Sequence, residues 1–219
     1  PESEKTLNEK NNVKALLYFI DDMEFVTKNA KVDNIYNIDM VFFPVLLAKC
    51  HYYLLVFNLK TPKIEILDNS KNGINVSVDD LYGESFKKLK KLFIEYLAYS
   101  EHRSWKSMKK AVCERIEMSW KTEYNVIDCG IFMMRHMETY MGYAKNWKCG
   151  FKNEGWEQKT QIYDLRKKYL SKILKSDLNC KRTVLLNELD QFRKLPYEER
   201  VKFLKDRIVR IQNRVKNLS

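Results

Sequence analysis

The chain has 219 residues, of which 45% are hydrophobic; this excludes wholesale disorder and suits one large domain or two small ones. No apolar run approaches the roughly 20 residues that cross a bilayer, and the polar start PESEKTLNEKNN does not resemble a signal peptide. The net charge is +11, and residues 151–219 contribute +9 of it, from 18 Lys and Arg against 9 Asp and Glu.

This excess of basic residues predicts a positively charged surface, but it does not indicate which kind of partner that surface binds. Acidic proteins, nucleic acid and anionic membranes are attracted about equally well by such a surface. The sequence has no Gly-rich phosphate loop, zinc-finger spacing or RNA-binding motif, so a solvated helical surface is favoured over a specific nucleic-acid site. We therefore expect protein partners rather than nucleic acid or a membrane.

The five cysteines are odd in number and contain no CxxC pair. This usage is typical of a reducing, intracellular compartment, and we expect a nuclear or cytoplasmic location. The sequence predicts no cofactor and no metal site.

The first part of the chain predicts a helix followed by short strands. Closely spaced apolar residues favour a helix over residues 13–27, and MVFFPVLL at 40–47 is typical of a buried strand. The β-rich runs at 51–58 and 63–67 are joined by LKTP, which predicts a hairpin with Pro62 in the turn.

The middle of the chain predicts two helices and one strand. A helix is expected to begin at Asp79 or Asp80, and CERIEMSW at 113–120 alternates apolar and polar residues like a strand. Asp128 is a good N-cap for a helix near 129–141, which we expect to stop at Gly142. Further helices are predicted at 157–176 and 183–194, and a last one after Pro196.

The hairpin brings a histidine and a carboxylate together. If its turn is centred near residues 60 and 61, positions 51 and 70 face each other, and Asp68 lies within a residue or two of facing His51. Such a carboxylate fixes the imidazole tautomer and raises its basicity. Taken alone, the pair is equally compatible with a simple surface contact.

Cys129 is the candidate nucleophile. It falls in the first turn of the predicted helix, where the helix N-terminus and a neighbouring imidazolium favour the thiolate. Gly130 has no side chain to block a substrate, and the free N–H groups of that turn can stabilise an oxyanion. With His51 as base and Asp68 as orienter, this set suits acyl transfer at cysteine, whereas the plain alternative is a buried structural thiol.

The other two histidines compete poorly for the role of base. His102 lies in the polar helix end SEHRS, and His136 lies in mid-helix two turns beyond Cys129, where it is expected to be packed or solvated.

Three segments in order carry a family resemblance: FFPVLLAKCHYYLLVFNLK, IEILDNS and NVIDCGIF. They resemble the cysteine proteases specific for ubiquitin-like proteins, chiefly SUMO. The segment DCGIFMMRHMETYMG looks most similar to plant members of the family, many of them encoded by transposable elements. The resemblance covers about residues 38–142 with a fainter tail to about 180. It implies an α+β fold with a central mixed sheet flanked by helices, a catalytic domain at 1–180 and a basic helical extension at 181–219.

The resemblance also implies roles for individual residues. His51 would be the general base, Asp68 its orienter and Cys129 the nucleophile. The family cleaves after a Gly-Gly terminus, at a peptide or lysine isopeptide bond, so SUMO or another ubiquitin-like protein would be the partner. Tyr52 stands where the family usually has Trp and would cover the Gly-Gly tail in an aromatic tunnel. The Trp-Leu segment that family members carry upstream has no match in residues 1–37.

Glu123 departs from the family pattern, which places an oxyanion-stabilising Gln six residues before the cysteine. An ionised carboxylate has no proton to donate and would repel an oxyanion. Three explanations remain open: a shifted loop in which Asn125 or the Trp120 indole donates, a protonated Glu123, or a weak enzyme. Glu123 and Gly130 are therefore the candidate oxyanion residues, and Tyr52, Trp120 and Asn125 the candidate substrate contacts.

The last helix carries a short apolar seam. Val201, Leu204, Ile208, Ile211, Val215 and Leu218 follow at spacings of three and four residues, over less than three heptads. Basic flanking residues would make two parallel copies repel each other. Docking on its own domain and binding of an acidic helical partner both remain open.

Three functions are compatible with these features. The first is a cysteine protease acting on SUMO or a similar modifier, which the complete triad favours. The second is a non-catalytic binding module, which Glu123 favours. The third and weakest is a basic nucleic-acid-associated protein derived from a transposon.

Overall fold

The structure is a computed structural model of the whole chain. It describes the backbone of residues 2–32, 34–48, 50–73, 75–125 and 127–216, with their side chains except those of 2–10, 211 and 214–216. The chain divides into two compact units, Pro1–Ile162 and Tyr163–Ser219, which are described separately.

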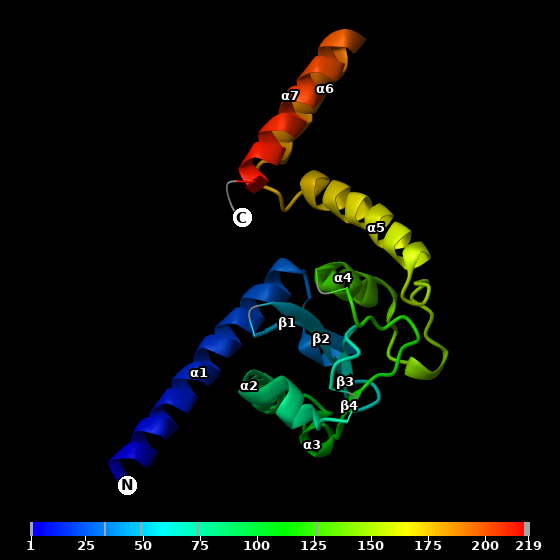
Figure 1. Cartoon of the computed structure of the whole chain (residues 1–219). Coiled ribbons are helices and arrows are strands. Elements are labelled where there is room, and N and C mark those ends of the chain that lie inside the picture. The colour runs from blue at the N-terminus through cyan, green and yellow to red at the C-terminus, as the bar shows by residue number, and fades with distance from the viewer. Residues whose placement is uncertain (1, 33, 49, 74, 126, 217–219) are drawn as a thin grey trace. The chain divides into compact units, whose positions relative to one another are not determined.

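A four-stranded mixed sheet forms the centre of the first unit (Figure 1). Its strands, in their order across the sheet, are β1 (Met40–Leu47), β2 (His51–Asn58), β3 (Lys63–Leu67) and β4 (Cys113–Arg115). The first three pair antiparallel, and β4 pairs parallel with β3. The predicted strands at 40–47, 51–58 and 63–67 are confirmed at their predicted bounds, but the first was wrongly expected to be buried: β1 is an edge strand whose residues are partly or fully exposed.

The strand predicted at 113–120 was wrong beyond Arg115. Ile116 still donates its N–H to the carbonyl of Ile66, but β3 ends at Leu67 and offers little further backbone for pairing. Ile116, Met118 and Trp120 remain buried in alternation. The alternation of apolar and polar residues therefore indicates which side chains are buried here, and it does not mark a hydrogen-bonded strand.

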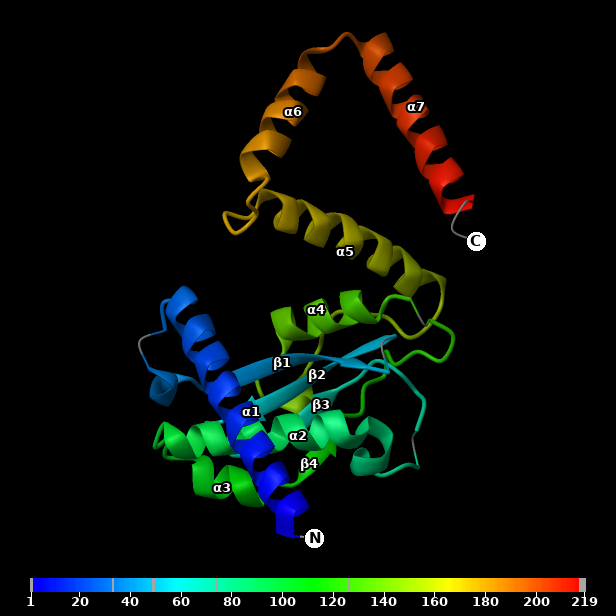
Figure 2. The same ribbon diagram turned by 90° about the vertical axis from the view of Figure 1, so that its left-hand side faces the viewer.

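Helices cover both faces of this sheet, as Figure 2 shows. Helices α1 (Glu2–Asn29) and α2 (Val78–Tyr99) cover one face, and α4 (Cys129–Thr139) covers the other. The remaining helical elements are η1 (Ile35–Asn37), α3 (Trp105–Lys110), η2 (Ala144–Asn146), α5 (Trp156–Lys175), α6 (Arg182–Lys194) and α7 (Tyr197–Lys216). The helices predicted at 13–27, 157–176 and 183–194 are confirmed, although the first is longer than expected.

The larger core lies on the α1 and α2 face. Side chains at alternate strand positions, among them Leu55, Phe57 and Ile64, are fully buried there against Phe86 and Phe93 of α2. Aromatic rings dominate this contact, with the rings of Phe57 and Phe93 centred 4.4 Å apart. This packing holds β2 and β3 in place and thereby fixes the ends that carry His51 and Asp68.

Two helix ends differ from the prediction by one or two residues. Helix α2 begins at Val78, just before the predicted start at Asp79 or Asp80, because the Ser77 hydroxyl accepts the Asp80 N–H and caps the helix. Helix α4 ends at Thr139, before Gly142, which follows with φ of +83° in the left-handed region.

His102 is buried, contrary to the polar helix end expected from SEHRS. Its Nδ1 accepts the Ser104 N–H, and the Ser104 hydroxyl donates to the carbonyl of Leu59. These contacts fold the segment back onto the hairpin turn, and burial lowers the pKa of His102.

The second unit contains the end of α5 together with α6 and α7. The rings of Phe192 and Phe203, 5.4 Å apart, join α6 to α7. Leu204 and Ile208 of the predicted seam are exposed, while the seam positions 211, 215 and 218 lie outside the described side chains. An acidic helical partner for this seam stays a prediction. None of the helices in the described ranges is long and apolar enough to cross a membrane.

Candidate active site

The hairpin register places His51 and Asp68 as the turn predicted. Leu54 faces Leu67, and continuing this register by three residues brings position 51 opposite position 70. The His51 Nε2 lies 2.7 Å from the Asp68 Oδ1, and the two side chains are 21% and 3% exposed. A carboxylate buried this deeply excludes the simple surface contact.

Asp68 accepts hydrogen bonds from several elements at once. The Tyr82 hydroxyl of α2 donates to Oδ2 at 2.7 Å, the Ser70 N–H donates to Oδ1 at 2.9 Å, and the Arg115 Nη2 of β4 lies 3.2 Å from Oδ2. Arg115 also donates to the carbonyls of Ser70 and Asn72, which fixes its own position. No sequence pattern indicated Tyr82 or Arg115 as partners, since neither is near Asp68 along the chain.

These contacts decide the protonation of the pair. Burial alone would raise the pKa of Asp68, but the hydrogen bonds from His51, Ser70 and Tyr82 outweigh it and leave the pKa below its ordinary value. Asp68 is therefore ionised at neutral pH. Because a carboxylate only accepts, His51 Nε2 donates the hydrogen in this contact, which leaves Nδ1 as the ring nitrogen that can accept a proton.

Cys129 is the first residue of α4 and is 6% exposed. Its Sγ lies 4.0 Å from the carbonyl oxygen of Cys50, the residue that precedes His51. The thiol thus lies beside the backbone that carries the candidate base. A Cβ placed on Gly130 would meet nothing within 4 Å, so the space next to the thiol is open.

Asp128 occupies the N-cap position of α4 but does not cap it with its side chain. Its carbonyl accepts from Ile131 and Phe132, while its Oδ2 accepts from the Asn125 Nδ2 at 2.8 Å. The predicted side-chain cap was therefore wrong, because the carboxylate belongs to the turn formed by Asn125.

A cavity of about 450 Å³ is lined by four of the candidate residues, while Cys129 and Gly130 are not part of its lining. His51, Asp68, Glu123 and Asn125 line it together with Leu47, Cys50, Ser70, Asn72, Leu81 and Thr122. Glu123, which stands where the family pattern has Gln, therefore lines the same cavity as His51. Tyr52 is 39% exposed and does not line this cavity.

Trp120 lies in the core instead of the cavity. Its indole Nε1 donates to His136 Nε2 at 3.1 Å, and its ring packs edge-on against Trp147. Burial lowers the pKa of His136 to about 3, so this imidazole is neutral and accepts the indole proton. The expectation that His136 is packed is confirmed, and the indole N–H is already bonded.

Glu154 holds the loop of residues 122–125 and was not found from the sequence. Its carboxylate accepts the N–H groups of Glu123, at 2.9 and 3.1 Å, and of Tyr124, at 2.9 Å. Lys71 Nζ lies 3.4 Å from the same carboxylate. Burial raises the pKa of Glu154, but these donors together outweigh it and lower the pKa overall. No pattern links residue 154 to residue 123, because the contact depends on the path of the chain between them.

A comparison with protein families identifies the chain. Residues 4–178 match the model of the Ulp1 protease family, C-terminal catalytic domain. The chain belongs to this family. The α+β cysteine protease fold predicted from the three motifs is therefore confirmed, and the match ends close to the predicted domain boundary at 180. The compact units divide earlier, at residue 162, so the predicted boundary stays a prediction.

The chain is also similar to solved structures of the SUMO protease Ulp1. One has its catalytic cysteine oxidised to a sulfinic acid, at 21% identity over 67% of this chain and 57% of that chain, with a TM-score of 0.45. Another, with the catalytic cysteine oxidised to a sulfonic acid, has 20% sequence identity over 64% of this chain and 55% of that chain, with a TM-score of 0.42. A third is the C-terminal Ulp1 protease domain in complex with SMT3, the yeast ortholog of SUMO. It has 23% sequence identity over 51% of this chain and 45% of that chain, with a TM-score of 0.37.

The chain spans about half the length of these structures. No curated protein sequence gives a significant match.

Proposed function

We propose that the chain is a cysteine peptidase that cleaves after the C-terminal Gly-Gly of SUMO or a related ubiquitin-like modifier. The observation that carries this proposal is the His51–Asp68 hydrogen bond, together with a thiol at the start of α4 that lies 4.0 Å from the carbonyl oxygen of Cys50, the residue before His51. The family membership supports the reaction class. Precursor processing and deconjugation both follow from the same chemistry.

The proposed reaction begins with proton transfer. His51 Nδ1 takes the Cys129 proton, and Asp68 stabilises the resulting imidazolium through Nε2–H. The thiolate attacks the carbonyl carbon of the terminal glycine and forms an oxyanion. As this intermediate collapses, the C–N bond breaks and His51 returns the proton to the departing amine. Water, activated by His51, then hydrolyses the thioester and releases the glycine carboxylate.

Backbone N–H groups are the proposed oxyanion donors. The first N–H groups of a helix have no partner within it, and those of Cys129 and Gly130 begin α4. Asn125 is less suited, because its Nδ2 already donates to Asp128 and its Oδ1 accepts from Ile127 and Asp128. Trp120 is committed to His136. Tyr52, at the exposed start of β2, is proposed to cover the Gly-Gly tail.

A second function rests on Glu123. This residue is exposed in the cavity that His51 lines, so its charge opposes a developing oxyanion there. A binding module that still accepts the Gly-Gly tail, with chemistry weakened or lost, is the alternative.

A modifier with a C-terminal electrophile separates the two functions. We expect SUMO carrying a vinyl sulfone to form an adduct with the full chain, slowly with His51→Ala and not at all with Cys129→Ala. Cys50→Ser is the matched control, since Cys50 is exposed and lines the same cavity, and it should keep the adduct. Binding of SUMO without any adduct would overturn the protease proposal in favour of the binding module.

A further inference from the structure

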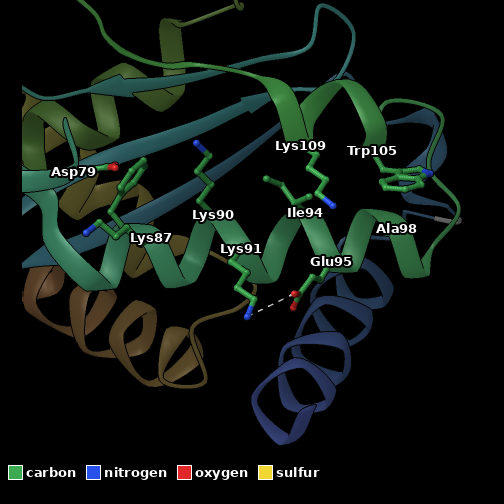
Figure 3. A pocket seen from close by; sticks show the side chains of 10 residues that line it. Asp79, Lys87, Lys90, Lys91, Ile94, Glu95, Ala98, Trp105 and Lys109 are labelled. Carbon is green, nitrogen blue, oxygen red and sulfur yellow. Dashed lines mark ion pairs between the residues drawn. The ribbon is translucent and has the colours of Figure 1, made fainter. Parts of the chain in front are cut away.

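A second cavity lies on the other side of the sheet from α4. It measures about 530 Å³ and lies along α2 and α3 (Figure 3). Cys129 is carried by α4, whereas α2 and α3 belong to the opposite layer (Figure 2). A ligand bound here would leave the cavity around His51 open, so the site is independent of the proposed protease activity.

Helical spacing explains the composition of this cavity. Phe86, Lys90, Ile94 and Ala98 follow one another at intervals of four along α2 and therefore share one face. The short helix α3 adds Trp105 and Lys109 from its own face, again four residues apart. The result is an apolar floor between two helices, and Figure 3 shows Ile94 between Lys90 and Lys109.

The charge of the cavity is positive and partly uncompensated. Four lysines line it against two acidic residues, Asp79 and Glu95. Lys91 Nζ lies 3.8 Å from Glu95, and Lys87 pairs with Glu84 at 3.1 Å. Among the residues that the structure describes, Lys90 and Lys109 form no ion pair. Two ammonium groups are therefore available to a ligand.

We propose that this cavity binds an acidic segment of a protein partner, with one aromatic or aliphatic side chain on the floor and carboxylates on Lys90 and Lys109. An apolar pocket with a few placed charges is the usual form of such a site. Nucleic acid fits less well, because successive bases stack on several exposed aromatic rings. Of the two aromatic residues that line the cavity, Phe86 is fully buried, which leaves Trp105 alone.

Fluorescence anisotropy on the full chain tests this proposal. The probe is a fluorescein-labelled peptide with one phenylalanine between two short runs of glutamate. Two matched peptides replace the phenylalanine by serine or every glutamate by glutamine. We expect the first peptide to bind about tenfold more tightly than either of the others, because both the floor and the charges contribute.

A pair of double variants locates the binding. Lys90→Gln with Lys109→Gln should weaken the first peptide about tenfold, since both available charges are lost. Lys88→Gln with Lys110→Gln removes the same charge from exposed positions of α2 and α3 outside the cavity lining, and should change binding by less than about twofold. Thermal unfolding of both variants checks that the fold is kept.

Three results would overturn the proposal. Equal weakening by the two double variants would mean attraction by net charge alone. Equal binding of the serine peptide would remove the role of the apolar floor. Tighter binding of a single-stranded oligothymidine, lost with Lys90→Gln and Lys109→Gln, would assign the cavity to nucleic acid.

Discussion

Asp68 and the loop of residues 122–125 line the same cavity but are held in different ways. Asp68 is buried and receives donors from β2, α2 and β4, so its position is determined several times over. The loop has exposed residues, Glu123 and Tyr124, and its outer part is held by the single carboxylate of Glu154. Several buried contacts therefore specify the position of Asp68, whereas the exposed residues Glu123 and Tyr124 depend on one partner, Glu154.

The largest expected effect comes from substitution of Asp68. Asp68→Asn keeps the size of the side chain but cannot stabilise the imidazolium or impose the correct tautomer. The rate of Gly-Gly cleavage should fall by on the order of 10⁴-fold, as in other triads. Tyr82→Phe removes one donor and keeps the carboxylate, and we expect a loss of only about tenfold, comparable with one hydrogen bond to a charged group. A rate for Asp68→Asn within tenfold of the natural chain would refute the assigned role.

The next effect tests the loop. Glu123→Gln removes a negative charge from the cavity and supplies an N–H donor with almost no change in size. We expect the cleavage rate to rise by up to about 100-fold, mainly in kcat, because the interaction forms in the transition state. The double variant with Cys129→Ala must stay inactive. An unchanged rate in an already active chain would show that residue 123 does not face the oxyanion.

His136 of α4, which accepts the indole proton of Trp120, gives the stability of the fold a pH dependence. Burial lowers the pKa of His136 from 6.5 to about 3, so the unfolded chain takes up this proton first as the pH falls. The stability contributed by neutral His136 is present above pH 6.5 and is lost progressively as the pH falls toward about 3. The loss between pH 6.5 and 5 should reach about 2 kcal/mol, at about 1.4 kcal/mol for each pH unit. Urea unfolding of the natural chain and His136→Gln across this range measures it, and equal slopes for the two would contradict the assignment.

The smallest expected effect concerns the contact between Glu154 and the loop of residues 122–125. Glu154→Gln keeps one oxygen acceptor but loses the charge that binds two N–H groups and Lys71. We expect kcat to fall about fivefold through misplacement of the loop. Glu157→Gln is the matched control on exposed surface and should have no effect. Because the pKa of Glu154 is lowered, its contribution should persist above the ordinary pKa of a glutamate and be lost as the pH falls through the lowered value. A kcat that is insensitive to Glu154→Gln would show that the loop is held by other contacts.

Local sequence determined the elements whose partners lie close along the chain. The strands at 40–47, 51–58 and 63–67 and the register that joins His51 to Asp68 could be predicted, because a short turn fixes which residues of a hairpin face each other. The position of Cys129 at a helix start followed equally from the polar-to-apolar change after Asp128. The family motifs were readable for the same reason, since each lies within one continuous segment.

Tertiary structure decided the contacts that join distant segments. Arg115 reaches Asp68 across 47 positions and Glu154 reaches Glu123 across 31, and no periodicity encodes either contact. The same applies to Trp120, which is bonded to His136, and to residues 116–120, which kept the alternation of a strand after β3 had ended. A sequence pattern records whether a residue is buried, but which group it meets there depends on how the whole chain packs.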